Sequence, residues 1–328
     1  MNSLDIIYIC DNGFAEVAGI SILSLFENNP KEQISLKVHV LGVEISQINK
    51  QRFERLGKQY GQTVEVLDAT EQYKKIQKLN LSSYRGSEMT NLRLHFDQMI
   101  SNEIQRVLYI DCDTIVCGNL QGLCDFELNG KLLGMVYDAY GRILNEEKDS
   151  AYYNAGVLLI DCERWRREHW CERIENFIAS NTRKLVHPDQ DVFNIVCKNE
   201  IEVLPMNYNL QVVHREYSEK LYFRYLAPET YYTKEEVQDA CENPAILHMI
   251  RYLGTNPWYT DGKLHPDYQQ FQKYKMQSEW AENRATVMKT YFVIRCERML
   301  HKILPKRVFF PISIAAIRFA MKKDENYI

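Results

Sequence analysis

The sequence predicts an α/β protein that is built around a mostly parallel β-sheet. In the N-terminal part of the chain, short continuously apolar segments alternate with segments of helical spacing. This alternation is typical of βαβ units, whose parallel strands are buried on both faces. Several of the apolar segments also end in acidic residues, and ligands of open α/β sheets bind at the carboxyl ends of the strands. The length of 328 residues suits one large domain with or without a small appendage.

The N-terminal part contains three predicted strands and two predicted helices. Residues 6–10 form a continuous apolar run, which Asp11, Asn12 and Gly13 interrupt. Residues 15–26 have helical spacing, and a following Asn-Asn-Pro sequence ends the helix. The pattern then predicts a strand, a helix and a strand at residues 35–42, 46–56 and 63–67.

The central part continues the α/β pattern less regularly. Residues 70–89 are polar, and a helix is expected at 90–100. Residues 106–111 form a buried strand that ends in acids, and the strand predicted at 132–137 ends at Asp138. The remaining expected elements are strands at 152–161, 201–204 and 245–249 and a helix at 165–179. Four strand ends therefore carry acids, namely Asp11, Asp111 with Asp113, Asp138 and Asp161.

The charge is unevenly distributed along the chain. The formal net charge of −4 gives the whole molecule no electrostatic reason to bind nucleic acid. Residues 289–323 contain nine Lys and Arg residues against one acid, Glu297, so this segment carries +8 and the rest −12. We therefore divide the chain into a catalytic domain, 1–285, and a basic extension, 286–328. Basic amphipathic segments bind anionic membrane surfaces, so we expect the extension to bind such a surface. The alternative is a terminal helix that packs on the catalytic domain.

The cysteines and the N-terminus indicate a reducing compartment. Nine scattered cysteines form no CxxC pair and no Cys/His cluster with zinc-site spacing. The N-terminus lacks the basic start and the apolar run of a signal peptide, and no apolar run approaches the length of a transmembrane helix. We expect free thiols and a cytoplasmic protein.

The segment Asp111-Cys112-Asp113 is the first candidate site. Residues two apart in an extended backbone face the same side, so both carboxylates could share one hard cation such as Mg²⁺ or Mn²⁺. A polar turn after a strand is the alternative. With Thr114, the segment also matches the Asp-x-Asp-x-Thr motif of phosphatases, whose first Asp is a nucleophile. That motif usually ends the first strand of its domain, whereas here it follows a long α/β stretch.

Six segments in order resemble glycosyltransferase family 8, the family of glycogenin and the bacterial lipopolysaccharide galactosyltransferases. They are IIYICDNGF, TNLRLHF, RVLYIDCDTIV, YYNAGVLLID, HPDQDVFN and LPMNYNLQ. The resemblance covers residues 6 to about 258. It implies a nucleotide-diphospho-sugar transferase fold of the GT-A type, in a single domain.

The resemblance also implies a donor-binding site. Asp11 and Asn12 match contacts to the nucleotide base and ribose, although the next position, often Asn in the family, is Gly13. Arg93 matches an arginine that bridges the donor sugar and acidic residues. Asp138 and Asn154 match residues that hydrogen-bond the donor sugar. The alternatives without a role in donor binding are a surface arginine for Arg93 and a turn-forming residue for Asn154.

Asp189 and Gln190 match the family motif beside the transferred sugar. The resemblance places Asp189 on sugar hydroxyls and Gln190 near the anomeric carbon. The family retains the anomeric configuration, yet an amide is a poor nucleophile. The resemblance thus favours departure and attack on one face, with the leaving phosphate oxygen taking the proton of the acceptor. Pro188 and Asp189 would equally suit a helix start.

The resemblance makes His248 the third metal ligand beside Asp111 and Asp113. A nitrogen ligand favours Mn²⁺ over Mg²⁺. The sequence departs from the family after His248, because two extra residues precede Gly254 and the phosphate-binding lysine is replaced by Asn256. Arg251 or Lys263 could supply the missing charge.

These matches imply a retaining, metal-dependent transferase. It would move glucose or galactose from UDP-glucose or UDP-galactose to a saccharide or lipid-linked glycan of a lipopolysaccharide, capsule or other surface glycan. The basic extension would hold it peripherally on the inner face of the membrane. The alternatives from other classes are a non-catalytic nucleotide-sugar-binding protein and the phosphatase.

Overall fold

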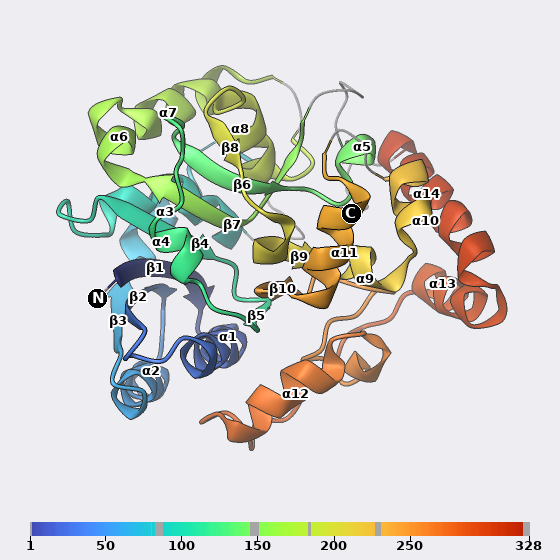
Figure 1. Ribbon diagram of the computed structural model, residues 1–328, viewed down its shortest axis with the longest axis horizontal. Helices are drawn as coiled ribbons and strands as arrows, with labels where there is room; N and C mark the ends of the chain where they lie inside the picture. The colour runs from blue at the N-terminus through green and yellow to red at the C-terminus, as the bar shows by residue number, and fades with distance from the viewer. Residues whose placement is uncertain are drawn as a thin grey trace.

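The fold is described from a computed structural model of the chain. The structure describes residues 2–79, 81–82, 88–144, 151–182, 185–226 and 231–323, without the side chains of residue 142 and residues 320–323. The last five residues of the predicted extension lie outside this part. Figure 1 shows a central sheet with helices on both faces and a pair of C-terminal helices, α13 and α14, at one side.

A seven-stranded mixed sheet forms the centre, in the order β3-β2-β1-β4-β7-β6-β8. Its strands are β1 (Asn2–Asp11), β2 (Ile34–Val43), β3 (Thr63–Asp68), β4 (Arg106–Ile110), β6 (Leu133–Tyr137), β7 (Tyr153–Asp161) and β8 (Ile201–Val203). Strand β7 runs antiparallel to both of its neighbours, and every other pairing is parallel. The prediction of a mostly parallel α/β sheet is therefore confirmed.

Strand β1 shows why the sheet is covered on both faces. Its alternate side chains point to opposite faces, so Leu4, Ile6 and Tyr8 join one core while Ile7 and Ile9 join the other. The first core lies under α1 (Ala15–Asn28), α2 (Gln47–Gln59) and α12 (Tyr268–Gln277). The second lies under α3 (Thr70–Ile76), η1 (Met89–Gln98), α6 (Cys162–Arg167), α7 (Trp170–Ser180) and α8 (Pro188–Val196).

A second, three-stranded sheet positions a histidine beside the acidic segment. It consists of β5 (Thr114–Val116), β10 (Ile246–His248) and β9 (Leu210–Gln211), in that order. Strand β10 runs antiparallel to β5, and the register pairs His248 with Thr114. Because β5 follows directly on Asp113, this pairing brings a residue far along the chain to the end of β4. The predicted short strand at 245–249 is thereby confirmed as β10.

Two predicted helices differ from the structure. The helix expected at 165–179 is two helices, α6 and α7, because His169 adopts a left-handed backbone conformation with φ of 56°. The helix expected at 90–100 is the 3₁₀ helix η1, which a kink at His95 interrupts. Hydrophobic spacing does not report such single-residue interruptions, since both halves still bury one face.

One of the four acidic strand ends was placed wrongly. Asp161 ends β7, and its register partner on β4 is Arg106, the first residue of that strand. Because β7 is antiparallel to β4, Asp161 lies at the opposite edge of the sheet from Asp111. There its carboxylate accepts a hydrogen bond from the Arg164 backbone N–H and caps α6.

The remaining elements join the sheets and form the C-terminal part. They are α4 (Gln121–Cys124), α5 (Gly141–Leu144), η2 (Met206–Asn209), α9 (Val212–Glu216), α10 (Glu219–Tyr225), α11 (Lys234–Glu242), η3 (Gly262–Leu264), α13 (Phe292–Ile303) and α14 (Lys306–Lys323). Phe310 of α14 stacks on Tyr217 with ring centroids 3.9 Å apart. In the described part of the chain, no helix is long and apolar enough to cross a membrane. All nine cysteines are free thiols.

Candidate functional site

The candidate site lies at the edge of the large sheet where β1, β4 and β6 end and β7 begins. Asp11 ends β1, Asp111 follows β4, and Asp138 follows β6. Asn154 lies at the start of the antiparallel β7, so it joins the same edge. Three of the four predicted acidic strand ends therefore lie at one edge of the sheet.

Asp111, Asp113 and His248 converge on one point. Each offers a ligand atom, and the three atoms lie within 4.8 Å of one another. The His248 Nε2 atom lies 3.3 Å from Asp113 Oδ1 and 3.8 Å from Asp111 Oδ2. The imidazole is almost fully buried, whereas the two carboxylates are about a fifth and a quarter exposed. The cluster is thus anchored in the protein and open on its carboxylate side.

A chain of hydrogen bonds determines which nitrogen of His248 carries a proton. The Gly156 backbone N–H donates to Asn154 Oδ1, which orients that amide and makes its oxygen the acceptor for Asn209 Nδ2 at 2.8 Å. The Asn209 oxygen must then face His248 Nδ1, 2.9 Å away, and accepts its N–H. The Nε2 lone pair of the neutral ring is therefore directed toward Asp111 and Asp113.

Gly156 leaves the space that the imidazole occupies. A Cβ atom at this position would lie 2.3 Å from the His248 Cε1 atom and 2.6 Å from Nδ1. Any side chain here would displace the ring. The glycine in the YYNAG segment is thus needed for close packing of β7 against His248.

Arg93 connects Asp111 with Asp189. Its guanidinium donates to Asp111 Oδ1 at 2.8 Å and pairs with Asp189 Oδ2 at 3.1 Å. It also donates to the Ala155 carbonyl and lies over the ring of Tyr109, 4.6 Å from the ring centroid. Arg93 is buried, so the interpretation as a surface helix arginine is wrong.

Tyr109 and Arg93 together occupy one oxygen of Asp111. The Tyr109 hydroxyl donates to Asp111 Oδ1 at 2.5 Å. Oδ1 is thus engaged by two donors, which leaves Oδ2 turned toward His248. Tyr109 and Asn209 are the polar contacts of the cluster that sequence reasoning missed. Tyr109 lies two residues before Asp111, on the same side of the strand, and Asn209 lies within the quoted LPMNYNLQ segment.

Gln190 is hydrogen-bonded to Asn154 and Asp138, the two residues expected to bind the donor sugar. Its Oε1 atom accepts from the Ala155 backbone N–H at 3.0 Å and from Asn154 Nδ2 at 3.2 Å. Its Nε2 atom donates to Asp138 Oδ2, which also accepts from Asn154 Nδ2. Asp138, Asn154, Asp189 and Gln190 are all buried. Asn154 therefore forms side-chain bonds to three site residues and is not merely a turn former.

The carboxylates and the imidazole perturb one another. Burial lowers the pKa of His248, but the carboxylates of Asp113 and Asp111 outweigh burial and raise it overall. Burial raises the pKa of Asp113, yet the charge and hydrogen bond of His248 lower it overall. The pKa of Asp111 is raised, mainly by burial and against the effect of Arg93. The site thus concentrates negative charge that a cation would offset.

Asp11 and Asn12 lie exposed where β1 ends and the following loop begins. The Asp11 carboxylate accepts from the Phe14 backbone N–H at 2.8 Å. The Asn12 oxygen accepts from the Ser46 backbone N–H and from Asn49 Nδ2, both at 2.9 Å. These bonds hold the loop in a defined shape at the same sheet edge as Asp111.

The rearranged loop after His248 is tied to its surroundings. Buried Asn256 donates to the Met249 carbonyl at 2.9 Å and so braces the loop. The Arg251 guanidinium donates to the Gly254 carbonyl, and Lys263 is exposed. The rings of Trp258 and Phe14 are nearly perpendicular, with centroids 5.4 Å apart, and this contact joins the loop to the residues after Asp11.

The donor set suits a divalent cation. Two carboxylate oxygens and one imidazole nitrogen, with the other ring nitrogen held by Asn209, form the ligand pattern of oxygen-preferring transition ions such as Mn²⁺. The outer partner fixes the tautomer that ligation requires. The residues present therefore fit a bound ion.

Comparison with known proteins identifies a family and a shared fold. A family model described as glycosyl transferase family 8 matches residues 5–262. General stress protein A of Bacillus subtilis is 27% identical over 285 residues, which cover 84% of this chain and 94% of that protein. Lipopolysaccharide 1,3-galactosyltransferase of Salmonella typhimurium is 27% identical over 296 residues, 85% of this chain and 80% of that protein.

A solved structure shows the same fold. The crystal structure of the galactosyltransferase LgtC in complex with donor and acceptor sugar analogues aligns with a TM-score of 0.62 at 20% identity. The alignment covers 89% of this chain and 99% of that one. The GT-A-type architecture expected from the sequence is thereby confirmed.

Proposed function

Since the chain belongs to glycosyl transferase family 8 and is a glycosyltransferase, we propose that it moves a hexose from UDP-glucose or UDP-galactose with retention of configuration. The acceptor is a saccharide or lipid-linked glycan of a lipopolysaccharide, capsule or other surface glycan. One observation carries the proposal: Asp111, Asp113 and His248 converge beside the buried group of Asp138, Asn154, Asp189 and Gln190.

Asp111, Asp113 and His248 are the residues that would hold the metal ion. When bound, the ion supplies positive charge that offsets the charge of the leaving diphosphate. Mn²⁺ is proposed rather than Mg²⁺, because a histidine nitrogen belongs to the donor set. Arg93 keeps Asp111 Oδ2 directed at this position by binding the other oxygen.

The buried polar group binds the hexose. Asp189 and Asp138 accept hydrogen bonds from sugar hydroxyls. Asn154 and Gln190 hold the Asp138 carboxylate in place, and Arg93 holds that of Asp189. The Gln190 oxygen already accepts two hydrogen bonds, so it is a weak nucleophile. This supports departure and attack on the same face, with the leaving phosphate oxygen taking the proton of the acceptor hydroxyl.

The exposed loop of Asp11 and Asn12 binds the nucleotide. It lies at the same sheet edge as Asp111 and contacts the loop after His248 through Phe14 and Trp258. The diphosphate would span the space between them. Arg251 or Lys263 would supply the positive charge that the family lysine provides elsewhere.

The choice of acceptor class is supported by the relatives. The matched protein of Salmonella typhimurium is a lipopolysaccharide 1,3-galactosyltransferase, and one of Escherichia coli is a lipopolysaccharide 1,2-glucosyltransferase, 23% identical over 98% of this chain and 91% of that protein. The two relatives differ in the hexose that their names give. We therefore propose a hexose donor of either kind.

The basic extension 286–328 binds an anionic membrane surface and holds a cytoplasmic enzyme on the inner face of the membrane. Helix α13 supports this, because Phe292, Met299 and Ile303 form an outward stripe at helical spacing and are more than half exposed. Arg295 and Lys302 are exposed on the same helix. We expect residues 286–328 to confer binding to anionic liposomes at low salt; binding that is unchanged when they are deleted contradicts this assignment.

UDP release tests the proposed reaction. The full-length chain is incubated with a panel of UDP-sugars and Mn²⁺, with and without saccharide acceptors, and compared with Asp113→Ala. We expect metal-dependent UDP release that an acceptor stimulates and that Asp113→Ala abolishes. Release without metal, or release unaffected by Asp113→Ala, contradicts the mechanism. Binding without release would identify a nucleotide-sugar-binding protein, and hydrolysis of simple phosphate esters would identify the phosphatase, which the family match does not support.

A further inference from the structure

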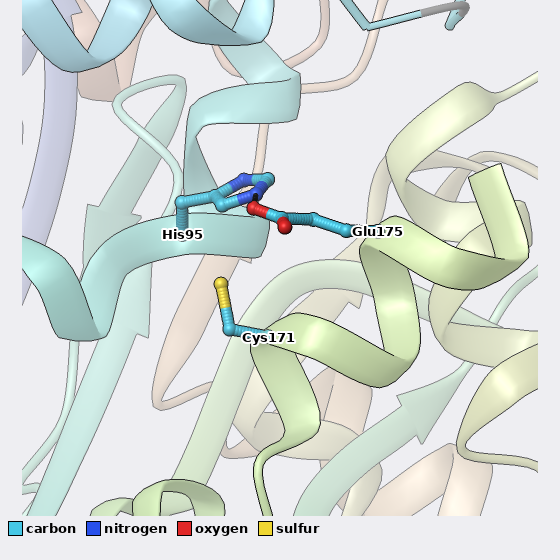
Figure 2. Close-up of side chains that lie close together, drawn as sticks. All are labelled: His95, Cys171 and Glu175. Carbon is cyan, nitrogen blue, oxygen red and sulfur yellow. Dashed lines mark hydrogen bonds and ion pairs between the residues drawn. The ribbon is translucent and has the colours of Figure 1, made fainter. Parts of the chain in front are cut away.

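A second group of ligand atoms lies on the helical layer over the second core. His95 of η1 faces Cys171 and Glu175 of α7, and Figure 2 shows the three side chains pointing toward one another. One ligand atom of each lies within 4.8 Å of the others. His95 and Cys171 are buried, while the Glu175 side chain is 45% exposed. The group is thus anchored on the inside and open on the outside.

The local structure explains this convergence. Cys171 and Glu175 are four residues apart on α7, so they lie one above the other on the same face of the helix. His95 occupies the kink of η1, with φ of −126° and ψ of 22°, and its Nε2 atom lies 2.9 Å from Glu175 Oε1. Because His95 comes from a different segment than Cys171 and Glu175, the sequence spacing gives no sign of the group.

The surroundings give the group access to solvent and further carboxylates. A hollow of about 210 Å³ borders Cys171 and Glu175 and is also lined by Asp97 and Glu172, and by one cation, Arg166. The Asp97 Oδ1 atom is buried without a hydrogen bond to any residue that the structure describes. Gln98 Nε2 donates to the Cys171 sulfur at 3.1 Å, an outer contact of the kind that supports a thiolate ligand.

We propose that His95, Cys171 and Glu175 bind a thiophilic divalent transition-metal ion of the Zn²⁺ class. Nitrogen, sulfur and one carboxylate oxygen are the donors that Zn²⁺ prefers, and three protein ligands leave the fourth tetrahedral position for water in the hollow. The oxygen-rich Asp111 group selects a harder ion, so the two groups differ in the metal they take. The ion joins η1 to α7 and thereby braces the segment that carries Arg93.

A spectroscopic test separates the two metal groups. Co²⁺ is added to the full-length chain after chelator treatment, because a thiolate-to-cobalt charge-transfer band requires a sulfur ligand and the Asp111 group has none. We expect the band in the wild type and in Asp113→Ala, its displacement by Zn²⁺, and its loss in Cys171→Ser. Cys124→Ser, which changes a cysteine of α4, serves as the matched control and keeps the band. The absence of the band in the wild type, or its persistence in Cys171→Ser, overturns the proposal.

Glu175→Gln provides a second test that is less sensitive to folding, because the side chain is partly exposed. Zn²⁺ alone is titrated by calorimetry into Asp113→Ala and into the Asp113→Ala/Glu175→Gln double variant. We expect the second variant to bind more weakly by more than the roughly 10- to 100-fold that loss of an outer-shell partner costs. Zn²⁺ should also raise the unfolding temperature of Asp113→Ala but not of the double variant. Equal affinities would show that His95 and Glu175 form only a hydrogen-bonded pair beside a thiol, which contradicts the proposal.

Discussion

Replacing Asn209 by alanine is expected to weaken metal binding without changing any ligand. The Asn209 amide is fully buried and bonds His248 Nδ1 at 2.9 Å and Asn154 Oδ1 at 2.8 Å. In the variant the His248 N–H is left without its acceptor, which costs about 1–3 kcal/mol, and the ring can adopt the other tautomer. Loss of an outer partner of a ligating histidine typically lowers metal affinity by roughly 10- to 100-fold.

The assay is the Mn²⁺ concentration that gives half-maximal UDP release at saturating donor. Asn207→Ala is the matched control, since Asn207 lies on the same 3₁₀ helix and is only partly buried. Urea unfolding of each variant verifies that the protein is folded under the assay conditions. We expect a higher half-saturating Mn²⁺ concentration for Asn209→Ala alone. A folded Asn209→Ala variant with the wild-type Mn²⁺ requirement would refute the argument that Asn209 determines the tautomer of His248.

Three further changes have defined outcomes. Gly156→Ala places a Cβ atom 2.3 Å from the His248 ring, so UDP release should require more Mn²⁺, and an unchanged Mn²⁺ requirement argues against close packing there. Arg93→Ala leaves the buried carboxylate of Asp189 and the largely buried one of Asp111 without their partner. Urea unfolding should show a loss of about 3–5 kcal/mol, and a loss below 1 kcal/mol contradicts the arginine bridge. Burial lowers the pKa of His214 to about 3, so between pH 6.5 and 3 the unfolded chain binds one more proton than the folded chain. The free energy of unfolding therefore decreases as the pH is lowered through this range, by up to about 1.4 kcal/mol per pH unit. His214→Leu should remove this part of the slope in urea unfolding at several pH values, and an identical slope in both proteins rules out a neutral buried histidine.

The strands of the large sheet could be predicted because the pattern of apolar residues that marks a strand lies within a few consecutive residues. A continuous apolar run identified β1, and the alternation of strand-like and helix-like segments identified β2 to β4. The helix after Asn12 was found within two residues of its observed end. Strand direction carries no such local signal. Asp161 was grouped with the site because β7 was assumed to be parallel, whereas its antiparallel pairing places Asp161 at the far edge.

The site was predictable where a motif carried it and not where tertiary structure assembled it. Asp111 and Asp113 follow a buried strand, and the family resemblance added His248. The outer contacts that orient these groups come from Asn209 and Tyr109, which act through side-chain bonds between separate segments. Neither periodicity nor spacing reports such bonds.

The central claim is that Asp111, Asp113 and His248 hold a divalent ion that the nucleotide sugar requires. The most direct measurement is binding of Mn²⁺ to the chelator-treated chain with and without UDP, detected by electron paramagnetic resonance. We predict one UDP-dependent Mn²⁺ ion per chain in the wild type, lost in Asp113→Ala and weakened in His248→Ala. UDP-dependent Mn²⁺ binding of equal strength in all three proteins would contradict the account.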